Sequence, residues 1–367
     1  MPKDAAMGLS LDEETMADAL GRSGYRSMLV GKWHLGAHPN MHPLKRGFNE
    51  FFGFLGGGHQ YFPSAWQIVD PLSVDDEGAS YKTKLNRGLA VVEEQEYITD
   101  AFSREAVSFV DRNRNNPFFL YLTYNAPHSP LQAPDQYLSR FKHIADSKRR
   151  TYAAMVSAID DGVGKLLDKL KVTGQDKNTL LFFLSDNGGP LDNGSSNHPL
   201  TGKKGNLYEG GIRVPFAMQW PGVIPSGTVY EKPVISLDIF ATALGSLQKT
   251  VQTKNLLDGV NLIPFLTGKK KGAPHEILFW RNQDMKAYAA INAEGKKLWM
   301  KGDTTFLYDL GKSGAEKQNI ANENPELVIR MKKQVAEWDK GLKLPAFLGL
   351  SQRDEYIRLR NKANQPQ

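Results

Sequence analysis

LLFFLSDNGGPLDNGSSNHPLTGKKGNLYEGGIRVPF, residues 180–216, is the stretch that decides the fold. It begins with the apolar run 180–184 and passes directly into a carboxylate, an amide and two glycines. A continuously apolar run is typical of a strand that is buried on both faces of a sheet. Open α/β sheets bind ligands just beyond the carboxyl ends of such strands, so we expect Asp186 and Asn187 to be ligand-binding residues.

The order of helix, strand and polar loop recurs around residues 10–36, 97–130 and 152–190. Ser10 and Glu13 have the spacing of a capping box, which predicts that the first helix begins there. A repeated alternation of helix and strand favours a parallel sheet with helices on its faces. We therefore predict an α/β fold with a mostly parallel sheet.

The pattern changes after the basic, glycine-bounded linker at 268–272. Short strands are predicted at hairpin spacing, followed by one helix, which indicates a small antiparallel sheet with a packed helix. We predict an α/β domain over 1–270 and a C-terminal α+β subdomain with a polar tail over 271–367. The tail from Ser351 is expected to be extended or disordered.

Composition excludes several classes of protein. The formal net charge is +6, but Lys and Arg are mixed with Asp and Glu along the chain, which argues against a nucleic-acid partner and equally fits a basic site for anionic substrates. Without cysteine there is no disulfide, thiolate metal site or cysteine nucleophile. No apolar run approaches the roughly 18 residues that span a bilayer, and the first residues lack the apolar core of a signal peptide. We expect no membrane partner, and the oligomeric state stays open.

Polar or charged groups stand beside glycine or proline in GKWHLG (31–36), APHSP (126–130), SDNGG (185–189) and TGKKGNLYEGGIRVP (201–215). Each motif alone has a structural explanation. Asp-Asn-Gly initiates turns, a histidine before Ser-Pro satisfies loop carbonyls, and a single lysine is usually a solvated surface charge. Trp33 is expected to pack rather than to take part in chemistry.

Taken together, the motifs carry two kinds of ligand. Asp186 and Asn187 supply hard oxygen atoms of the kind that bind Ca²⁺ or Mg²⁺. Cationic donors for a tetrahedral anion come from a second group of residues, namely Lys32, His34, His128 and Lys204. The combination suits a sulfate or a phosphate ester.

In this order and spacing, the motifs resemble the sulfatase family, in particular its arylsulfatase and N-acetylgalactosamine-6-sulfatase-like branch. The resemblance extends through GYRSMLVGKWHLG, YLTYNAPHSPLQAP, AIDDGVGKLLDKL and FLYDL to NIANENPEL. It implies an alkaline-phosphatase-like fold and hydrolysis of sulfate esters of aryl compounds or carbohydrates.

The resemblance also implies roles for the motif residues. Asp186 and Asn187 would bind a divalent metal, usually calcium. The residues that match the family's catalytic positions divide into Lys32 and His34, which would contact the nucleophile and the ester oxygen, and His128 and Lys204, which would hold the sulfate. Arg213 is expected to be structural. Many relatives are exported, so the resemblance favours a periplasmic or secreted protein.

The chain departs from the family pattern in one respect. Sulfatases carry two neighbouring aspartates that bind the metal, and a Cys-x-Pro-x-Arg or Ser-x-Pro-x-Arg motif whose first residue becomes the formylglycine nucleophile. This chain has no cysteine and no Ser-x-Pro-x-Arg sequence, and it has no aspartate pair on a first strand ahead of such a motif. We expect a sulfatase that lacks its N-terminal segment, with weak metal binding, no activity of its own, and exposed strand edges and apolar faces. The alternatives are a pseudoenzyme that binds sulfated glycans without cleaving them, and a hydrolase of phosphate or phosphonate monoesters.

Overall fold

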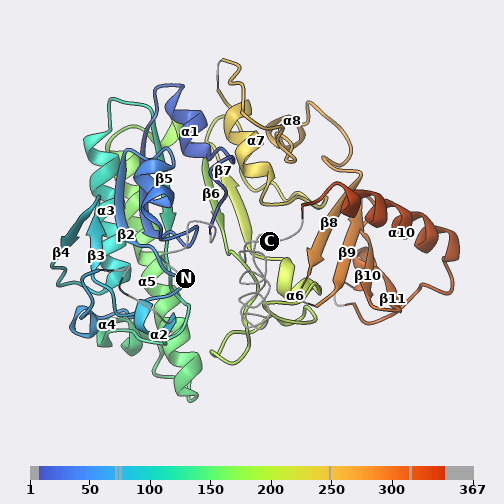
Figure 1. Ribbon diagram of the computed structural model, residues 1–367, viewed down its shortest axis with the longest axis horizontal. Coiled ribbons are helices and arrows are strands. Elements are labelled where there is room, and N and C mark those ends of the chain that lie inside the picture. The colour runs from blue at the N-terminus through green and yellow to red at the C-terminus, as the bar shows by residue number, and fades with distance from the viewer. Residues whose placement is uncertain are drawn as a thin grey trace, which may run out of the picture.

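Two β-sheets with a two-stranded ribbon between them organise the chain (Figure 1). The computed structural model describes residues 8–70, 73, 77–247, 249–283, 285–313 and 316–343. Within these residues the larger sheet has the strand order β4-β3-β2-β1-β5, the ribbon is β6-β7, and the C-terminal sheet has the order β11-β10-β9-β8.

The centre of the larger sheet is β1 (Arg26–Lys32), which pairs in parallel with β2 (Glu50–Phe54) and β5 (Phe118–Thr123). The short strands β3 (Leu85–Arg87) and β4 (Ala90–Val92) extend the sheet antiparallel beyond β2. Since β1, β2 and β5 run the same way, their carboxyl ends lie at one edge of the sheet. The loops expected to carry Lys32 and His128 therefore leave the sheet at this edge.

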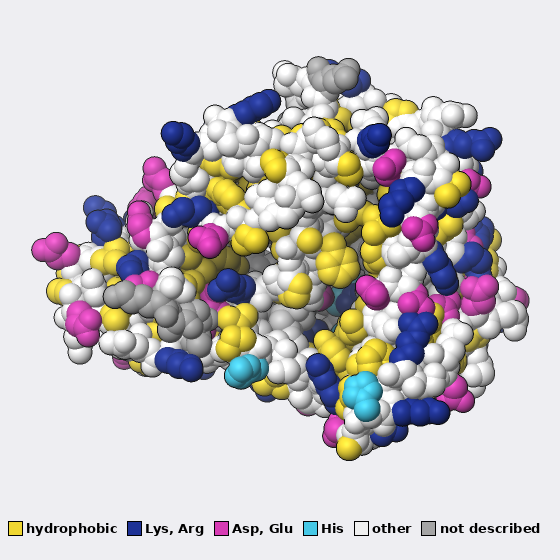
Figure 2. Space-filling view, turned by 180° about the vertical axis from the view of Figure 1, so that it is seen from behind, with side chains coloured by type: hydrophobic (Ala, Val, Ile, Leu, Met, Phe, Trp, Pro, Cys, Tyr) yellow, Lys and Arg dark blue, Asp and Glu magenta, His cyan; other side chains and the backbone are white. Residues whose placement is uncertain are grey.

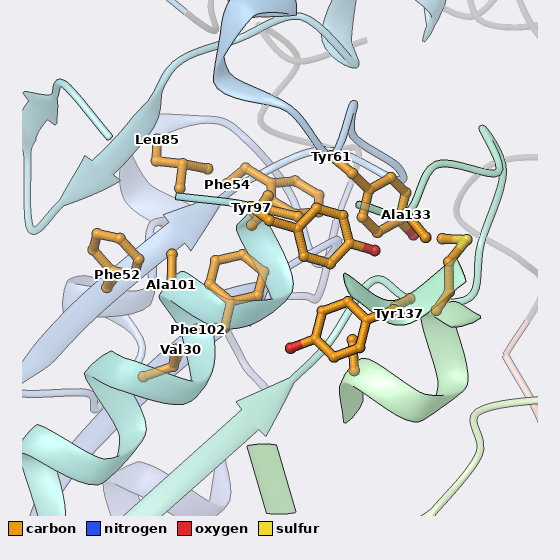
Figure 3. Packing of buried hydrophobic residues seen from close by; sticks show 14 of the residues in the cluster. Val30, Phe52, Phe54, Tyr61, Leu85, Tyr97, Ala101, Phe102, Ala133 and Tyr137 are labelled. Atoms are coloured by element: carbon orange, nitrogen blue, oxygen red, sulfur yellow. The ribbon is translucent and has the colours of Figure 1, made fainter. Parts of the chain in front are cut away.

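Helices α3 (Ile98–Arg112) and α5 (Ser147–Val172) pack against each other, and α3 packs on the sheet. Figure 3 shows the core between α3 and the sheet, in which Phe52 and Phe54 from β2 meet Phe102 from α3. The side chain of Asp146 caps α5 by accepting a hydrogen bond from the backbone of Arg149. In the described part of the chain, no helix combines the length and the apolar character that crossing a bilayer requires.

The first helix begins later than the sequence predicts. Helix α1 runs over Met16–Gly21, and its capping box is formed by Thr15 and Asp18 rather than by Ser10 and Glu13. The competing pair wins because the hydroxyl of Thr15 also donates to the carbonyl oxygen of Arg46, which anchors the helix start to the chain beyond β1. The remaining short helices are α2 (Glu77–Ser80), α4 (Asp135–Leu138), α6 (Glu209–Ile212), α7 (Asp238–Gly245), α8 (Ile263–Leu266) and α9 (Leu310–Ser313).

The strand expected to be buried on both faces is only half-buried. Strand β6 (Leu181–Leu184) pairs antiparallel with β7 (Phe216–Gln219), and within the described residues no strand pairs with its other edge. Its side chains are also incompletely covered, since Phe183 is 45% exposed and Leu184 36%. The apolar run correctly indicated a strand, but the expectation that it is buried on both faces was wrong.

The C-terminal sheet follows the predicted hairpin pattern. Its strands β8 (Ile277–Asn282), β9 (Ala287–Asn292), β10 (Lys296–Lys301) and β11 (Thr304–Asp309) pair antiparallel in sequence order. Helix α10 (Pro325–Lys340) buries Met331 and Val335 against this sheet. The predicted tail from Ser351 lies outside the described residues.

Candidate functional site

A cleft of about 3750 Å³ lies between β5, β6 and the C-terminal sheet. All the site residues predicted from the sequence line it: Lys32, His34, His128, Asp186, Asn187 and Lys204. Hydrophobic side chains gather around the hollow in the middle of the face shown in Figure 2. The structure thus brings the four sequence motifs to one cavity.

Lys32 and His34 are held where β1 leaves the sheet. The hydroxyl of Thr123 on β5 donates to the carbonyl oxygen of Lys32 at 2.7 Å, and the backbone N–H of His34 donates to Leu55 at 3.2 Å. Gly31 has φ +117°, and a Cβ there would lie 2.1 Å from the carbonyl oxygen of Thr123. Only glycine permits this close approach of β1 and β5. Trp33 is buried and donates to the carbonyl oxygen of Met41, as expected for a packing residue.

The electrostatic environment of His34 places the other motif residues within interaction range of its side chain. Desolvation is the largest influence on this imidazole, and it lowers the pKa from 6.5 to about 4. The positive charges that lower the pKa further belong to Lys32, His128 and Lys204, while Asp186 raises it. His34 therefore stands at the centre of a cluster of cationic groups with a single opposing carboxylate among those influences.

His128 follows β5 and has a defined ring orientation. Its Nδ1 lies 2.7 Å from the carbonyl oxygen of Ser129. Because a carbonyl oxygen only accepts, Nδ1 carries a hydrogen, and Nε2 remains for another partner. The hydroxyl of Tyr61 donates to the backbone carbonyl oxygen of His128 at 2.8 Å and fixes the loop from the core side.

The loops that carry Asp186 and Lys204 are joined backbone to backbone. The N–H of Lys204 donates to Gly189 at 3.1 Å, and the N–H of Gly188 donates to Gly211 at 3.1 Å. The side chain of Asn197 adds bonds to the N–H and carbonyl oxygen of Gly189 and to the carbonyl oxygen of Gly202. Residues 185–189 and 201–213 are therefore one structural unit.

The described residues supply only part of a divalent metal site. Asp186 is exposed to the cleft, and the amide nitrogen of Asn187 donates to Gly188, which leaves its amide oxygen available. Ca²⁺ takes six to eight oxygen ligands. Among the described residues, no group of three or more acidic or histidine side chains is placed to hold an ion. The donor set does not complete a calcium site.

Two groups of residues near the cleft were not predicted. Asn197 is half-buried and bridges Gly189 and Gly202, but nothing in its local sequence, SSNHP, distinguishes it from other loop amides. Lys297 on β10 forms buried ion pairs with Glu209 and Glu316, which lie far from it in sequence. No local sequence signal reveals such a long-range pairing. Arg213 lies 3.9 Å from Glu209, in line with the structural role expected for it.

Comparison with protein families gives two matches. The family model described as Sulfatase matches residues 3–249. The model described as N-sulphoglucosamine sulphohydrolase, C-terminal, matches residues 198–341.

Individual proteins give the same result. An uncharacterized sulfatase, YdeN, of Escherichia coli K12 is 33% identical over 305 residues, which cover 76% of this chain and 51% of that protein. The N-acetylgalactosamine-6-sulfatase of Mus musculus is 33% identical over 330 residues, which cover 87% of this chain and 61% of that enzyme. The chain thus spans about half the length of the first of these relatives and about three fifths of the second.

Among solved structures, that of Ps i-CgsB in complex with k-i-k-neocarrahexaose superimposes with a TM-score of 0.89. It is 35% identical, and the match covers 99% of this chain and 82% of that one. This likeness confirms the predicted fold class, an alkaline-phosphatase-like α/β sheet with a smaller C-terminal antiparallel sheet and helix.

Proposed function

The chain belongs to the sulfatase family, and we propose that its cleft binds the sulfate group of a sulfated carbohydrate as part of a sulfate-ester hydrolase. The observation that carries the proposal is that Lys32, His128, Lys204 and Asp186 all lie near enough to His34 to influence its pKa, and that all of them line one cleft. These residues come from four separate segments. Surface lysines and loop histidines without a common ligand have no reason to converge in this way.

Lys32 and His34 are proposed to face the ester oxygen, and His128 and Lys204 to hold the sulfate oxygens. The orientation of His128 supports this role, because Nδ1–H is engaged by Ser129 and Nε2 is left for a ligand. Lys204 is exposed to the cleft at the end of a loop that is tied to residues 185–189, so its charge can meet an anion beside Asp186.

His34 is neutral in the ligand-free cleft at neutral pH, because its pKa lies at about 4. An anion among the cationic side chains favours the protonated imidazole and raises this pKa. A sulfate ester would thus bring His34 toward the state in which it donates a proton to the departing alcohol. Binding of the substrate would therefore promote the protonation of His34 that acid catalysis requires.

The lining of the cleft supports a carbohydrate rather than free sulfate as the natural ligand. Trp280 and Asn282 on β8 line the same cleft as the cationic cluster, across from β6. Asn282 also donates to the carbonyl oxygen of Gly205, which places this strand beside the Lys204 loop. An aromatic ring next to amide groups is a suitable surface for sugar rings. The neocarrahexaose bound by the 35% identical relative is a carbohydrate as well.

Metal and nucleophile are separate parts of the proposal. Asp186 and Asn187 are proposed to bind Ca²⁺ or Mg²⁺, weakly with these donors alone. The chain has no cysteine and no Ser-x-Pro-x-Arg motif, so we expect no turnover of sulfate esters by residues 1–367. Measurable hydrolysis of an aryl sulfate by the purified chain would contradict this expectation. The domain boundary is likewise a proposal, with the α/β domain ending at residue 270 and the C-terminal subdomain beginning at residue 271.

The binding proposal is tested by isothermal titration calorimetry with a sulfated galactose disaccharide, its unsulfated form and its phosphate ester. We expect binding of the sulfated sugar only, and a loss of at least tenfold in affinity on Lys204→Ala. Lys203→Ala is the matched control, because Lys203 is an exposed neighbour that is not among the residues lining the cleft. Equal effects of the two substitutions, or equal affinity for the unsulfated sugar, would overturn the proposal. Preference for the phosphate ester would favour the phosphohydrolase alternative.

A further inference from the structure

A buried ion cluster joins the C-terminal sheet to the loop that carries Lys204. The ammonium group of Lys297 on β10 donates to Glu209 Oε1 at 2.7 Å and forms an ion pair with Glu316 Oε1 at 2.9 Å. The second oxygen of Glu316 accepts the backbone N–H of Glu209 at 2.8 Å. The side chains of all three residues are almost completely buried.

A buried ion cluster contributes little net stability to a fold. The desolvation of buried ions is often larger than their mutual attraction, and well-packed apolar groups frequently stabilise a protein as well or better. Here two carboxylates share one ammonium group. Burial accordingly raises the pKa of Glu316. The arrangement is therefore better explained by what it fixes in space than by stability alone.

Glu209 stands at the junction of the two site loops. It is the first residue of α6, and the next residue, Gly210, donates its N–H to the carbonyl oxygen of Thr201 at 2.7 Å. Gly211 accepts the N–H of Gly188. Three consecutive residues thus bond three different segments: Glu209 bonds the C-terminal sheet, Gly210 bonds the start of the Lys204 loop, and Gly211 bonds the Asp186 loop.

We propose that Lys297 is a positioning residue, which acts through Glu209 to hold residues 201–213 and thereby sets the place of Lys204 in the anion site. The proposal rests on the proposed function for its ligand, because the site it positions is the sulfate site. Stacking of Tyr208 on Trp299, with ring centroids 4.9 Å apart, holds the same loop by apolar contact. The ion cluster also constrains the orientation of the loop, because it binds the backbone N–H of Glu209 as well as its carboxylate.

The test compares Lys297→Met with Lys296→Met. Lys296 is the adjacent residue on β10 and pairs with Asp309 on β11 at 2.6 Å, within the C-terminal sheet. The two variants lose the same charge at neighbouring positions, so general electrostatics and sheet stability change in both. Inorganic sulfate affinity is measured by calorimetry, thermal unfolding gives stability, and hydrogen exchange reports on the amides of residues 201–213.

We expect Lys297→Met to lower sulfate affinity at least fivefold and to speed exchange in residues 201–213, whereas Lys296→Met changes affinity less than twofold. A folded Lys297→Met protein with wild-type affinity and exchange would overturn the proposal. If Lys297→Met does not fold, Glu209→Gln serves instead, with a smaller loss of affinity expected and wild-type affinity as the contradicting result. If the wild-type protein does not bind sulfate, the proposed function fails. Hydrogen exchange in residues 201–213 then still decides whether Lys297 positions the loop.

Discussion

The backbone N–H of Gly188 donates to the carbonyl oxygen of Gly211 at 3.1 Å, so the loop that carries Asp186 touches the loop that carries Lys204 without an intervening side chain. A Cβ on Gly188 would lie 1.8 Å from the carbonyl oxygen of Gly210, which is far inside any real contact. The close approach of the two loops therefore requires glycine at position 188. Gly210 and Gly211 are required by other contacts, because a Cβ on either would lie within 2.6 Å of backbone oxygen atoms of residues 201–206.

We predict that Gly188→Ala destabilises the protein by about 1–3 kcal/mol, because the loops must separate to admit the methyl group. Sulfate affinity should fall with it. The matched control is Gly164→Ala in α5, where a Cβ meets nothing within 4 Å and a helical alanine should stabilise by about 0.5–1 kcal/mol. Chemical denaturation of both variants measures these changes. A Gly188→Ala protein as stable as the wild type would show that the loop contact is unimportant.

Acid should destabilise the protein through His59, which is completely buried against the rings of Phe54 and Trp66. Burial is the main cause of its lowered pKa, about 4 instead of 6.5, and it outweighs the carbonyl oxygens of Gln60 and Thr83, which accept from the ring and raise the pKa. Between these values the unfolded chain binds the proton and the folded chain does not, so stability present above pH 6.5 is lost as the pH falls toward 4. The full shift corresponds to roughly 3 kcal/mol.

Urea denaturation at a series of pH values from 4 to 7 measures this effect. His59→Gln should be less stable at pH 7 and should show a flatter pH dependence, although not a flat one, because the pKa values of His34 and His42 are also lowered by burial. His143→Gln, at an exposed position, should leave the curve unchanged. Parallel curves for the wild type and His59→Gln would contradict the assignment.

Much of the fold could be predicted from local patterns. Each of the predicted repeats around 10–36, 97–130 and 152–190 contains a helix followed by a strand, and the predicted antiparallel strands and helix lie beyond residue 272, because hydrophobic periodicity reports which side of an element is buried. The proximity of the Lys32 and His128 loops also follows from the parallel direction of β1 and β5, whose carboxyl ends lie at one edge of the sheet. Local sequence was sufficient to predict a helix or strand wherever the burial of its side chains follows from the periodicity of that helix or strand alone.

What could not be predicted depends on contacts between distant segments. The run at 180–184 reads the same whether a second neighbour covers it or not, so the exposure of Phe183 was missed. Thr15 displaced Ser10 as the helix cap because of a bond to Arg46, which lies 31 residues away. Lys297 and Glu209 are 88 residues apart, and each alone resembles an ordinary surface charge in the sequence.

Calcium should bind this chain weakly, with a dissociation constant on the order of 10⁻³ M or weaker, because Asp186 and Asn187 provide few of the oxygens the ion requires. Calorimetric titration of the chelator-treated protein with CaCl₂ measures the affinity. Asp186→Asn should abolish the remaining binding, whereas Asp192→Asn, at an exposed position in the following loop, should not. Micromolar affinity that disappears in Asp186→Asn would show that further ligands complete the site.

The open edges of β5 and β6 should make the chain associate with itself. Tyr121 on β5 and Phe183 on β6 are each 45% exposed, both line the cleft, and in the described residues each strand has a neighbour on one edge only. Unpaired edges with apolar side chains are templates for further pairing. We predict concentration-dependent association in sedimentation velocity experiments. The substitution Phe183→Lys should decrease this association with little loss of stability, because the charge disfavours pairing at a position that is already exposed.

Leu89→Lys is the control, since Leu89 is 76% exposed in the turn between β3 and β4 and is not among the cleft-lining residues. A wild-type chain that stays monomeric at about 100 µM, or an equal effect of both substitutions, would mean that these edges are not the sites of association.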